Sequence, residues 1–367
     1  MNPQSVFCPN PDCPSRGQVG NGNIGIKSQK ERRYHCKTCG KSFAETKGTP
    51  LFGLKREHGL FFIIVTLLSY GCPPQAIVAA FGLDERTVFA WQKKAGQHCE
   101  QVHQAIVEQP RDLEHVQADE IRVKLANKVV IWMAMALQVT TRLWLGGVLS
   151  VHRDQRLIDR LAAKVKACAL PRPLLLATDG LISYVSAWRK AFRTPVLTGK
   201  RGRPSLLAWP GLVIGQVIKR HRAKRLVEID ARLVQGNEVQ RQGLSLPDQK
   251  LHSSYIERIN ATFRARLHGL VRRGRALYRQ EPTLQTGMYL VGTFYNFCTC
   301  HDSLRQHRPE GGRKWVERTP AMAAGLTDHC WSSAELLTYK LAPPPWVPPK
   351  RRGRKPKPVC PPAMVAA

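Results

Sequence analysis

The sequence has no apolar run long enough to cross a membrane as a helix. Its longest apolar run, LFFIIVTLLSYG at residues 60–71, is much shorter than the roughly 20 residues that such a helix needs. The first ten residues, MNPQSVFCPN, have neither the positive charge nor the apolar stretch of a signal peptide. These absences predict a cytoplasmic protein in a reducing compartment.

Acidic side chains are scarce in this chain. Aspartate and glutamate number 26 against 57 lysines and arginines, which gives a formal net charge of +31. Charge of this size repels itself in a compact chain unless an acidic partner neutralises it, and nucleic acid is the usual partner. The hydrophobic content of 43%, with eight Trp and eleven Phe, indicates a globular protein rather than a disordered one.

Cysteine is present in an odd number, eleven, which disfavours a disulfide framework. Four cysteines form two close pairs, Cys8 and Cys13 in CPNPDC and Cys36 and Cys39 in CKTC. Gly40 follows the second pair, where a tight turn requires it. The two pairs predict a zinc ribbon, in which short strands join two turns and four thiolates bind one structural Zn²⁺. Because four thiolates leave no open position, the metal would supply folding free energy rather than catalysis.

A helical pattern covers residues 60–104. An apolar helix ends at Gly71, and then a short helix, a turn at Gly82 and a second helix capped by Asp84 follow. This spacing is typical of a helix-turn-helix, whose second helix enters the major groove of DNA, and an ordinary helical hairpin is the alternative. The residues expected to contact bases or phosphates are Glu85, Arg86, Gln92, Lys93 and Lys94.

From residue 114 the pattern becomes that of strands. EHVQADEIRVKL alternates, and VVIWMAMALQVTTRLWLGGVLS predicts two more strands with a turn near Thr140. RDQRLIDRLAAKVKACAL predicts a helix, RPLLLATDG a buried strand and ISYVSAWRKAF another helix. This order predicts an α/β fold with a mixed sheet and flanking helices. A β-hairpin insertion is expected at about residues 195–250, and helices resume at Ser253 and after Thr283.

Two carboxylates occupy strand positions that suit catalysis. Asp179 ends the buried strand LLLATDG, and Asp119 lies in the first strand beside Glu120. Side chains alternate along a strand, so only one of Asp119 and Glu120 can share a site with Asp179. Parity groups Asp119 with Gln117, but it does not choose between the two acids.

A third acid stands alone in an arginine-rich segment. Glu257 is the only acid in SSYIERINATFRARLHGLVRRGRALYR, residues 253–279, which contains seven arginines. On a helical wheel of about 100° per residue, a polar row lies beside an apolar stripe. The polar row comprises Glu257, Asn260, Arg264 and His268. Glu257 is two turns from Arg264, too far for an i,i+4 ion pair, so the row is better placed to hold a metal ion and a phosphate backbone.

Together these segments resemble the DDE-class transposases of prokaryotic insertion sequences. The resemblance rests on the two cysteine pairs, the helix-turn-helix pattern, the acids of QADE and ATDG, and ERINATFRARL, which is similar to the family's Glu-x-x-Asn-x-x-x-Arg signature. The later segments YNFCTCHDSLR and ERTPAMAAGL are also similar to that group. The family pattern selects Asp119 rather than Glu120 as the first acid.

The resemblance implies an RNase H-like catalytic domain in a nucleoid-associated DNA transposase. Asp119, Asp179 and Glu257 would hold two Mg²⁺ ions, with Mn²⁺ as an alternative, for cleavage of the transposon end and strand transfer to target DNA. Arg264 and Asn260 would contact phosphate beside the scissile bond. The partners would be double-stranded DNA, at the terminal inverted repeats and the target, and further copies of the chain. A non-catalytic DNA-binding regulator derived from a transposase and an RNase H-like junction resolvase are the alternatives.

The expected organisation has five parts. They are a zinc ribbon at 1–50, a helix-turn-helix domain at 51–108, the catalytic domain at 109–310, a helical segment at 311–342 and a disordered, basic, Pro-rich tail at 343–367. KRGRP and RRGRKPK resemble the AT-hook, which lies in a narrow minor groove, and plain phosphate attraction is the alternative. The DNA-binding candidates in these motifs are Arg201, Arg203, Arg351, Arg352 and Arg354.

Overall fold

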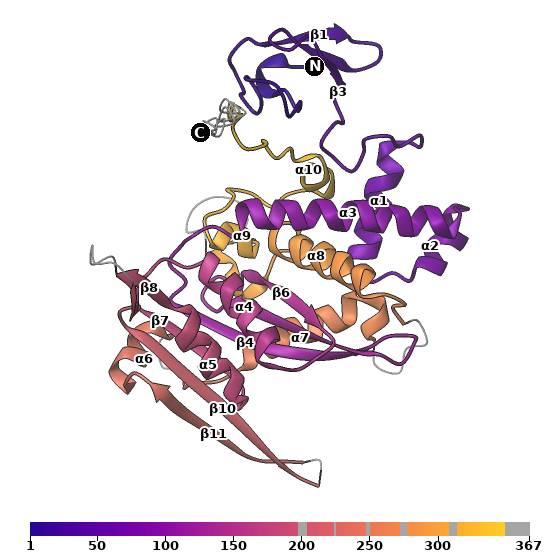
Figure 1. Ribbon diagram of the computed structural model, residues 1–367. Coiled ribbons are helices and arrows are strands. Elements are labelled where there is room, and N and C mark those ends of the chain that lie inside the picture. The colour runs from indigo at the N-terminus through magenta and orange to yellow at the C-terminus, as the bar shows by residue number, and fades with distance from the viewer. Residues whose placement is uncertain (197–203, 224, 247–249, 272–276, 308–313, 349–367) are drawn as a thin grey trace, which may run out of the picture. The chain divides into compact units, whose positions relative to one another are not determined.

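The structure divides into two compact units (Figure 1). The smaller unit comprises Met1–Gly48 with the segment that begins at Ala342, and the larger comprises Thr49–Leu341. The computed structural model describes residues 1–196, 204–223, 225–246, 250–271, 277–307 and 314–348. Among these residues, no helix combines the length and apolar character that crossing a membrane requires.

The smaller unit contains an antiparallel sheet in the order β1-β2-β3. Its elements are η1 (Pro3–Ser5), β1 (Ile24–Ser28), β2 (Arg33–Cys36) and β3 (Ser42–Ala44). Tyr34 and Phe43 stack in its core with ring centroids 5.9 Å apart, and Gly40 adopts a φ of +69° in the turn after Cys39. The short strands and the glycine turn are confirmed, but so small a core buries too little apolar surface to fold unaided.

Three helices open the larger unit. They are α1 (His58–Ser69), α2 (Pro74–Phe81) and α3 (Glu85–Ile106). Gly82 ends α2 with a φ of +59°, a left-handed conformation that glycine adopts without strain. Asp84 caps α3, because its side chain accepts a hydrogen bond from the Arg86 N–H at 2.8 Å. The predicted short helix, turn and cap are therefore confirmed.

A six-stranded mixed sheet forms the centre of the larger unit, in the order β11-β10-β7-β4-β5-β6. The strands are β4 (His115–Lys124), β5 (Val130–Gln138), β6 (Trp144–Ser150), β7 (Leu174–Thr178), β10 (Leu212–Arg222) and β11 (Arg225–Gln235). β4, β5 and β6 are antiparallel neighbours, whereas β7 runs parallel to β4, and β10 parallel to β7. The predicted α/β fold with a mixed sheet is confirmed.

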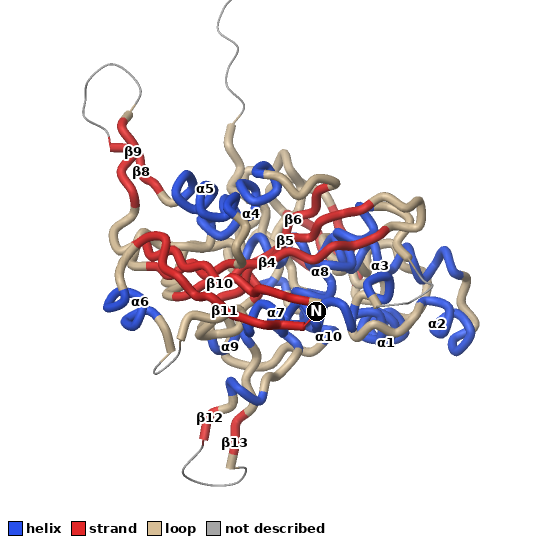
Figure 2. The backbone as a smooth tube through the Cα atoms, turned by 90° about the horizontal axis from the view of Figure 1, so that it is seen from below, coloured by secondary structure: helices blue, strands red, loops and turns tan. Residues whose placement is uncertain are grey.

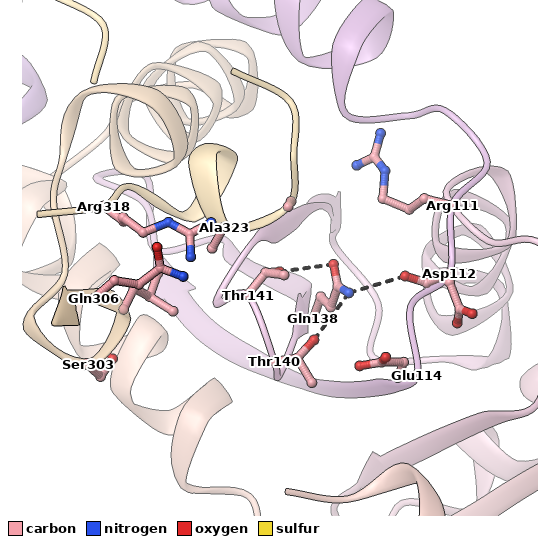
Figure 3. A pocket seen from close by; sticks show the side chains of 12 residues that line it. Arg111, Asp112, Glu114, Gln138, Thr140, Thr141, Ser303, Gln306, Arg318 and Ala323 are labelled. Atoms are coloured by element: carbon pink, nitrogen blue, oxygen red, sulfur yellow. Dashed lines mark hydrogen bonds between the residues drawn. The ribbon is translucent and has the colours of Figure 1, made fainter. Parts of the chain in front are cut away.

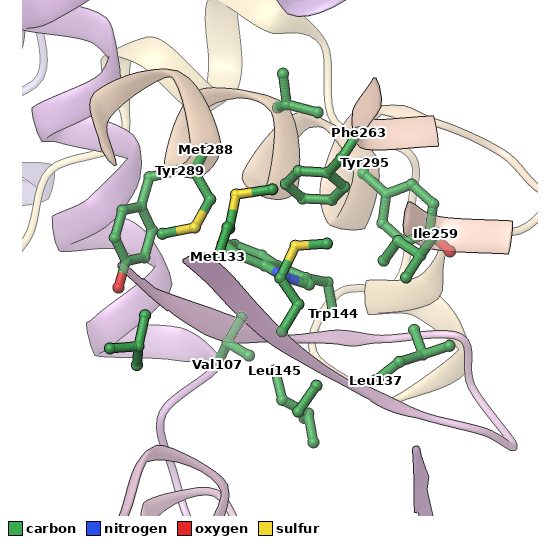
Figure 4. Close-up of a cluster of buried hydrophobic side chains, with 14 of the residues drawn as sticks. Val107, Met133, Leu137, Trp144, Leu145, Ile259, Phe263, Met288, Tyr289 and Tyr295 are labelled. Carbon is green, nitrogen blue, oxygen red and sulfur yellow. The ribbon is translucent and has the colours of Figure 1, made fainter. Parts of the chain in front are cut away.

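Helices cover both faces of this sheet (Figure 1). α4 (Gln155–Ala167) and α5 (Ile182–Ala191) lie on one face, and α7 (Ser254–Arg266) and α8 (Glu281–Cys298) lie on the other. Figure 4 shows the second face, where Trp144 packs against Phe263 of α7 and Tyr289 of α8 with ring centroids 5.5 and 5.6 Å apart. Gly292 permits the close approach of α8, since a Cβ there would lie 2.2 Å from the Trp144 ring. This packing holds α7 against the sheet.

The predicted hairpin insertion is present, but it also joins the central sheet. β10 and β11 pair as predicted, but β10 also pairs with β7, with Leu212 opposite Leu174. The reason is that the first half of β10 is as apolar and buried as β7, which is typical of a parallel strand. Three elements of this region were not predicted: β8 (Arg193–Val196), β9 (Ser205–Ala208) and α6 (Glu238–Leu244).

Short elements complete the larger unit. They are η2 (His268–Leu270), η3 (Asp302–Leu304), β12 (Gln306–His307), β13 (Trp315–Val316), α9 (Pro320–Ala323) and α10 (Ser333–Thr338). Two of the strand pairs, β8–β9 and β12–β13, form two-stranded sheets of their own, separate from the central sheet (Figure 2).

The end of α7 differs from the expected helix. α7 ends at Arg266, so His268 lies in the turn η2 and not on the helical row with Glu257. Gly269 disfavours continuation of the helix, and the His268 ring packs against Tyr278 at 4.7 Å. The predicted polar row is therefore wrong at His268.

Candidate functional site

The three predicted acids line one cavity. Asp119, Asp179 and Glu257 border a space of about 500 Å³, which Arg153 and Lys219 also line. Asp119 lies in the middle of β4, Asp179 directly follows β7, and Glu257 lies in the first turn of α7. Three segments that are distant in the sequence thus meet at one place.

The pairing of β4 with β7 brings the two aspartates together. These strands are parallel, with Gln117 opposite Ala177, so the same register two residues further on places Asp119 beside Asp179. The carboxyl ends of parallel strands are where ligands commonly bind in open α/β sheets. The register therefore explains why residues 60 positions apart can share a ligand.

Both oxygens of Asp119 accept hydrogen bonds. Oδ1 accepts from the Glu120 backbone N–H and Oδ2 accepts from the Asn260 side-chain amide, each at 2.8 Å. Asn260 was expected to contact phosphate, but it is only 2% exposed and its amide is bonded to Asp119. Asn260 therefore joins α7 to β4 and fixes the orientation of the first acid.

Asp179 belongs to a network that the sequence did not reveal. Its Oδ1 accepts from the Leu181 N–H at 3.0 Å, and its Oδ2 accepts from the Arg153 guanidinium at 3.4 Å. Arg153 also forms an ion pair with Glu120, whose other oxygen accepts a hydrogen bond from the Tyr184 hydroxyl at 2.8 Å. Arg153 thus bridges two carboxylates, one in the cavity and one behind it.

Glu257 contacts a cation from a different strand. Its Oε1 is bonded to the Lys219 ammonium of β10 and to the Ser253 hydroxyl. The sequence placed Glu257 two turns from Arg264, too far for an ion pair, and it did not identify Lys219 as a partner because the segment of β10 was predicted to form a separate hairpin. Arg153 and Lys219 together place two positive charges against the acids of this cavity.

A second grouping of acids competes with the predicted one. Carboxylate oxygens of Asp119, Glu120 and Asp179 lie within 4.8 Å of one another, and Glu257 lies outside this group. The side chain of Glu120 is only 1% exposed and both its oxygens have partners, whereas that of Glu257 is 45% exposed beside the cavity. The accessible set is therefore Asp119, Asp179 and Glu257, with Glu120 behind it.

The four predicted cysteines also meet. Sγ atoms of Cys8, Cys13, Cys36 and Cys39 all lie within 4.8 Å of one another, and all four thiols are free of disulfides. The Cys8–Cys39 and Cys13–Cys36 sulfur pairs are each 3.7 Å apart. Sulfurs about 2.3 Å from a tetrahedral zinc would lie about 3.8 Å apart, so this cluster has the dimensions of a four-thiolate metal site.

The surroundings of these acids shift their pKa values. Burial, followed by the neighbouring Glu120, Asp179 and Glu257 carboxylates, raises the pKa of Asp119 to about 7. Burial and then Asp179 raise the pKa of Glu120. Burial by itself would raise the pKa of Glu257, but the hydrogen bonds from Lys219 and Ser253 outweigh burial and lower the pKa. At neutral pH Asp119 is therefore partly protonated, and any bound cation would favour its ionised form.

We expect the contribution of Asp119 to stability to fall as the pH rises toward 7 in buffer without divalent cations. Since the pKa of Asp119 rises from an ordinary 3.8 to about 7, the folded state binds more protons than the unfolded chain between these values. The stabilising contribution of Asp119 is complete below the unfolded-state pKa of 3.8 and is lost as the pH rises past the folded-state pKa of about 7. The raised pKa of Glu120 acts in the same direction. Thermal unfolding across this range measures the effect. Buried histidines such as His103, whose pKa burial lowers to about 3, act in the opposite direction in both proteins. The effect of Asp119 is therefore the difference between the two profiles: Asp119→Asn should gain stability relative to the wild type as the pH rises, and parallel profiles would contradict the expectation.

Comparison with known proteins identifies no relative of this chain. No model of a known protein family matches the chain, and no curated protein matches it. The two sites and the net charge of +31 are therefore the observations that bear on function.

The predicted DNA-binding residues differ in their surroundings. Arg86 and Lys93 of α3 are exposed, whereas Lys94 is half-buried and its ammonium lies 3.4 Å from the Phe52 carbonyl. Gln92 is 4% exposed, so as a base contact it is a wrong prediction, and Arg264 is half-buried on α7. Five further candidates lie outside the described residues: Arg201, Arg203, Arg351, Arg352 and Arg354.

A second cavity, of about 600 Å³, is lined by Glu114, directly before β4 begins (Figure 3). There the Gln138 amide donates to the Asp112 carbonyl and the Thr140 hydroxyl, both at 3.3 Å, and accepts from the Thr141 hydroxyl at 2.9 Å. Asp112 and Glu114 line this cavity beside Arg111, but neither acid belongs to the single carboxylate cluster found among the described residues. This cavity therefore lacks the donor set of the first.

Proposed function

We propose that the protein is a DNA transposase of the insertion-sequence type, which binds DNA and catalyses Mg²⁺-dependent cleavage and strand transfer. The observation that carries the proposal is the cavity that Asp119, Asp179 and Glu257 share. Its acids come in the order that the family resemblance implies. The sheet supports an RNase H-like catalytic domain, because three antiparallel strands are followed by two strands parallel to the first, with helices on both faces.

The residues of the cavity fit divalent cations with a preference for oxygen ligands. All three acids offer carboxylate oxygens, which suit Mg²⁺ or Mn²⁺ and not soft metals. Two basic side chains already lie against these acids, which indicates that the site attracts positive charge. The Asn260 Oδ1 is buried without a hydrogen-bond partner, which leaves an oxygen beside Asp119 available to a ligand water.

Asp119, Asp179 and Glu257 would together hold two Mg²⁺ ions, which when bound supply an activated water and neutralise charge on the phosphodiester. The surrounding residues orient the acids. Asn260 holds Asp119 through its Oδ2, and Arg153 holds Asp179. Lys219 and Arg153 balance the negative charge of the acids, and both reach the cavity where a phosphate would lie.

The cysteine cluster would hold one structural Zn²⁺ in a zinc ribbon. Cysteine thiolates are preferred zinc ligands, and four of them in a tetrahedron form a closed site. The small hydrophobic core of residues 1–48 needs this contribution, because few apolar side chains are buried there.

DNA would be bound by α2 and α3 as a helix-turn-helix and by the basic surface. Arg86 and Lys93 are exposed on the N-terminal half of α3, the part of a recognition helix that faces the major groove. The charge of +31 supplies a further attraction to phosphate that does not depend on sequence. We propose that the helix and this charge bind the transposon ends and the target.

Binding to duplex DNA should depend steeply on salt. We expect the affinity to fall about 1,000-fold between about 50 and 200 mM salt, because each neutralised phosphate releases counterions. Replacing both Arg86 and Lys93 by alanine should lower the log–log slope by about 2. Gel shifts over a salt series measure the slope, with Gln97→Ala, an exposed neutral residue of the same helix, as the control. An unchanged slope in the double variant would exclude α3 from the interface.

A joining assay tests the proposed function. The full chain is incubated with Mg²⁺, duplexes that carry the inverted repeats flanking its coding region, and a target plasmid. A transposase produces 3′-hydroxyl ends joined covalently to the target. A regulator binds the duplexes without cutting them, and a junction resolvase cuts branched DNA without joining ends, so either outcome refutes the proposal.

A further inference from the structure

Gln117 is a fully buried amide on β4, two residues before Asp119. Its Nε2 donates to the His252 carbonyl at 2.7 Å. Its Oε1 accepts from the backbone N–H groups of Tyr255 and Ile256 at 3.1 and 3.0 Å. One side chain thus makes three hydrogen bonds to the backbone where α7 begins.

These bonds place Gln117 in the role of a helix cap. The first N–H groups of a helix have no partner within it, and the side chain of the N-cap residue usually accepts from the second or third of them. In α7 the N-cap residue is Ser253, which makes no such bond, and its hydroxyl contacts Glu257 instead. Gln117 supplies the missing acceptor from a neighbouring strand, because Tyr255 and Ile256 are the second and third residues of α7.

The cap lies beside the proposed site. Gln117 and Asp119 are two residues apart on one strand and therefore share a face. Asn260 of α7 bonds to Asp119 from the same face. The strand thus holds α7 at its first turn and again three residues after Glu257, and the third acid lies between the two attachments.

We propose that Gln117 is a positioning residue that sets the place of Glu257 relative to Asp119, and thereby the affinity of the site for divalent cations. This inference rests on the proposed function. Without the cap the first turn of α7 loses its acceptor, and Glu257 is in that turn. Outer residues that orient metal ligands typically contribute about 10- to 100-fold to metal affinity.

The alternative is that Gln117 only satisfies buried backbone groups. A purely structural role would lower stability without acting through Glu257. The two roles separate in a double-mutant cycle, because residues that act through one another give non-additive effects.

The test is calorimetric titration of the zinc-loaded full chain with Mn²⁺. Gln117→Met keeps the length of the side chain and removes its hydrogen bonds. The matched control is Gln138→Met, which changes another buried glutamine of the same sheet; Gln138 lies opposite Val116, bonds to the Asp112 carbonyl and lines the cavity of Figure 3. We expect Gln117→Met to weaken Mn²⁺ binding about 10-fold or more. Gln138→Met should leave binding unchanged, and Gln117→Met should add no loss in a Glu257→Gln background.

Gln117→Glu provides the rescue. It keeps an acceptor for the Tyr255 and Ile256 N–H groups, and as a buried carboxyl group facing the His252 carbonyl it is expected to be protonated and to donate there, so Mn²⁺ affinity should return toward that of the wild type. This variant also serves if Gln117→Met does not fold. Three results would overturn the inference: unchanged binding by Gln117→Met, an equal loss in Gln138→Met, or additive losses with Glu257→Gln. A wild-type chain that binds no Mn²⁺ at these acids would instead overturn the proposed function, and the inference with it.

Discussion

Asp119→Asn is expected to abolish Mg²⁺-dependent nicking and strand transfer while DNA binding persists. Asparagine keeps the shape of the side chain, but it removes the negative charge that would bind the cations. The loss should be at least about 1,000-fold, because ligands of one catalytic centre act as a unit. The measurement is the yield of nicked and joined DNA beside a gel shift on the same duplex.

The gel shift distinguishes lost chemistry from lost folding. Arg86 and Lys93, which we propose bind DNA, lie on α3 and do not line the cavity of the acids, so the variant should shift DNA like the wild type. Asp159→Asn is the matched control, since Asp159 of α4 pairs with Lys190 and does not line the cavity. It should retain full cleavage. Cleavage that survives Asp119→Asn would show that the first acid is assigned incorrectly.

Removing the zinc that we propose in the cysteine cluster should unfold residues 1–48 and leave the larger unit folded. Structural zinc contributes about 10–16 kcal/mol of apparent binding free energy in small domains, which is more than the small core of this unit can replace. Wild-type protein should contain one zinc ion per chain by elemental analysis. After chelation, limited proteolysis should cleave within residues 1–48 and spare the central sheet.

Single cysteine variants refine this result. Cys36→Ser removes one of the four buried or half-buried cysteines that we propose bind the zinc, and it should reproduce the effect of chelation. Cys72→Ser changes a half-buried cysteine outside the cluster and should leave zinc content unchanged. Protease resistance of residues 1–48 in the zinc-free protein would contradict a structural role for the metal.

The main helices and strands could be predicted from the sequence because their patterns depend on residues that are close together in the chain. Alternation in residues 114–125, and the apolar runs of 129–150 with a turn near Thr140, predict three strands, which the structure shows to be antiparallel neighbours. Apolar LLLAT predicts the buried strand before Asp179. Gly82 and Asp84 mark the end of α2 and the start of α3 through their own backbone and side-chain chemistry. Such signals depend on neighbours in the chain and not on tertiary contacts.

The surroundings of the acids depend on tertiary contacts, and the sequence did not reveal them. Arg153 and Lys219 reach Asp179 and Glu257 from a loop and from β10, and nothing local connects them. The pairing of β10 with β7 was missed because hairpin patterns predict only the partner that follows in the chain. Gln117 carried one usable signal, since its parity on the strand groups it with Asp119.

The most direct test is the position of Mn²⁺ in crystals of the full chain, found from its anomalous scattering. The account predicts density bounded by carboxylate oxygens of Asp119, Asp179 and Glu257, with Lys219 displaced from Glu257. Density held only by Asp119, Glu120 and Asp179, with Glu257 still paired to Lys219, would contradict the assignment of the third acid. No density at any of these acids would contradict the proposed function.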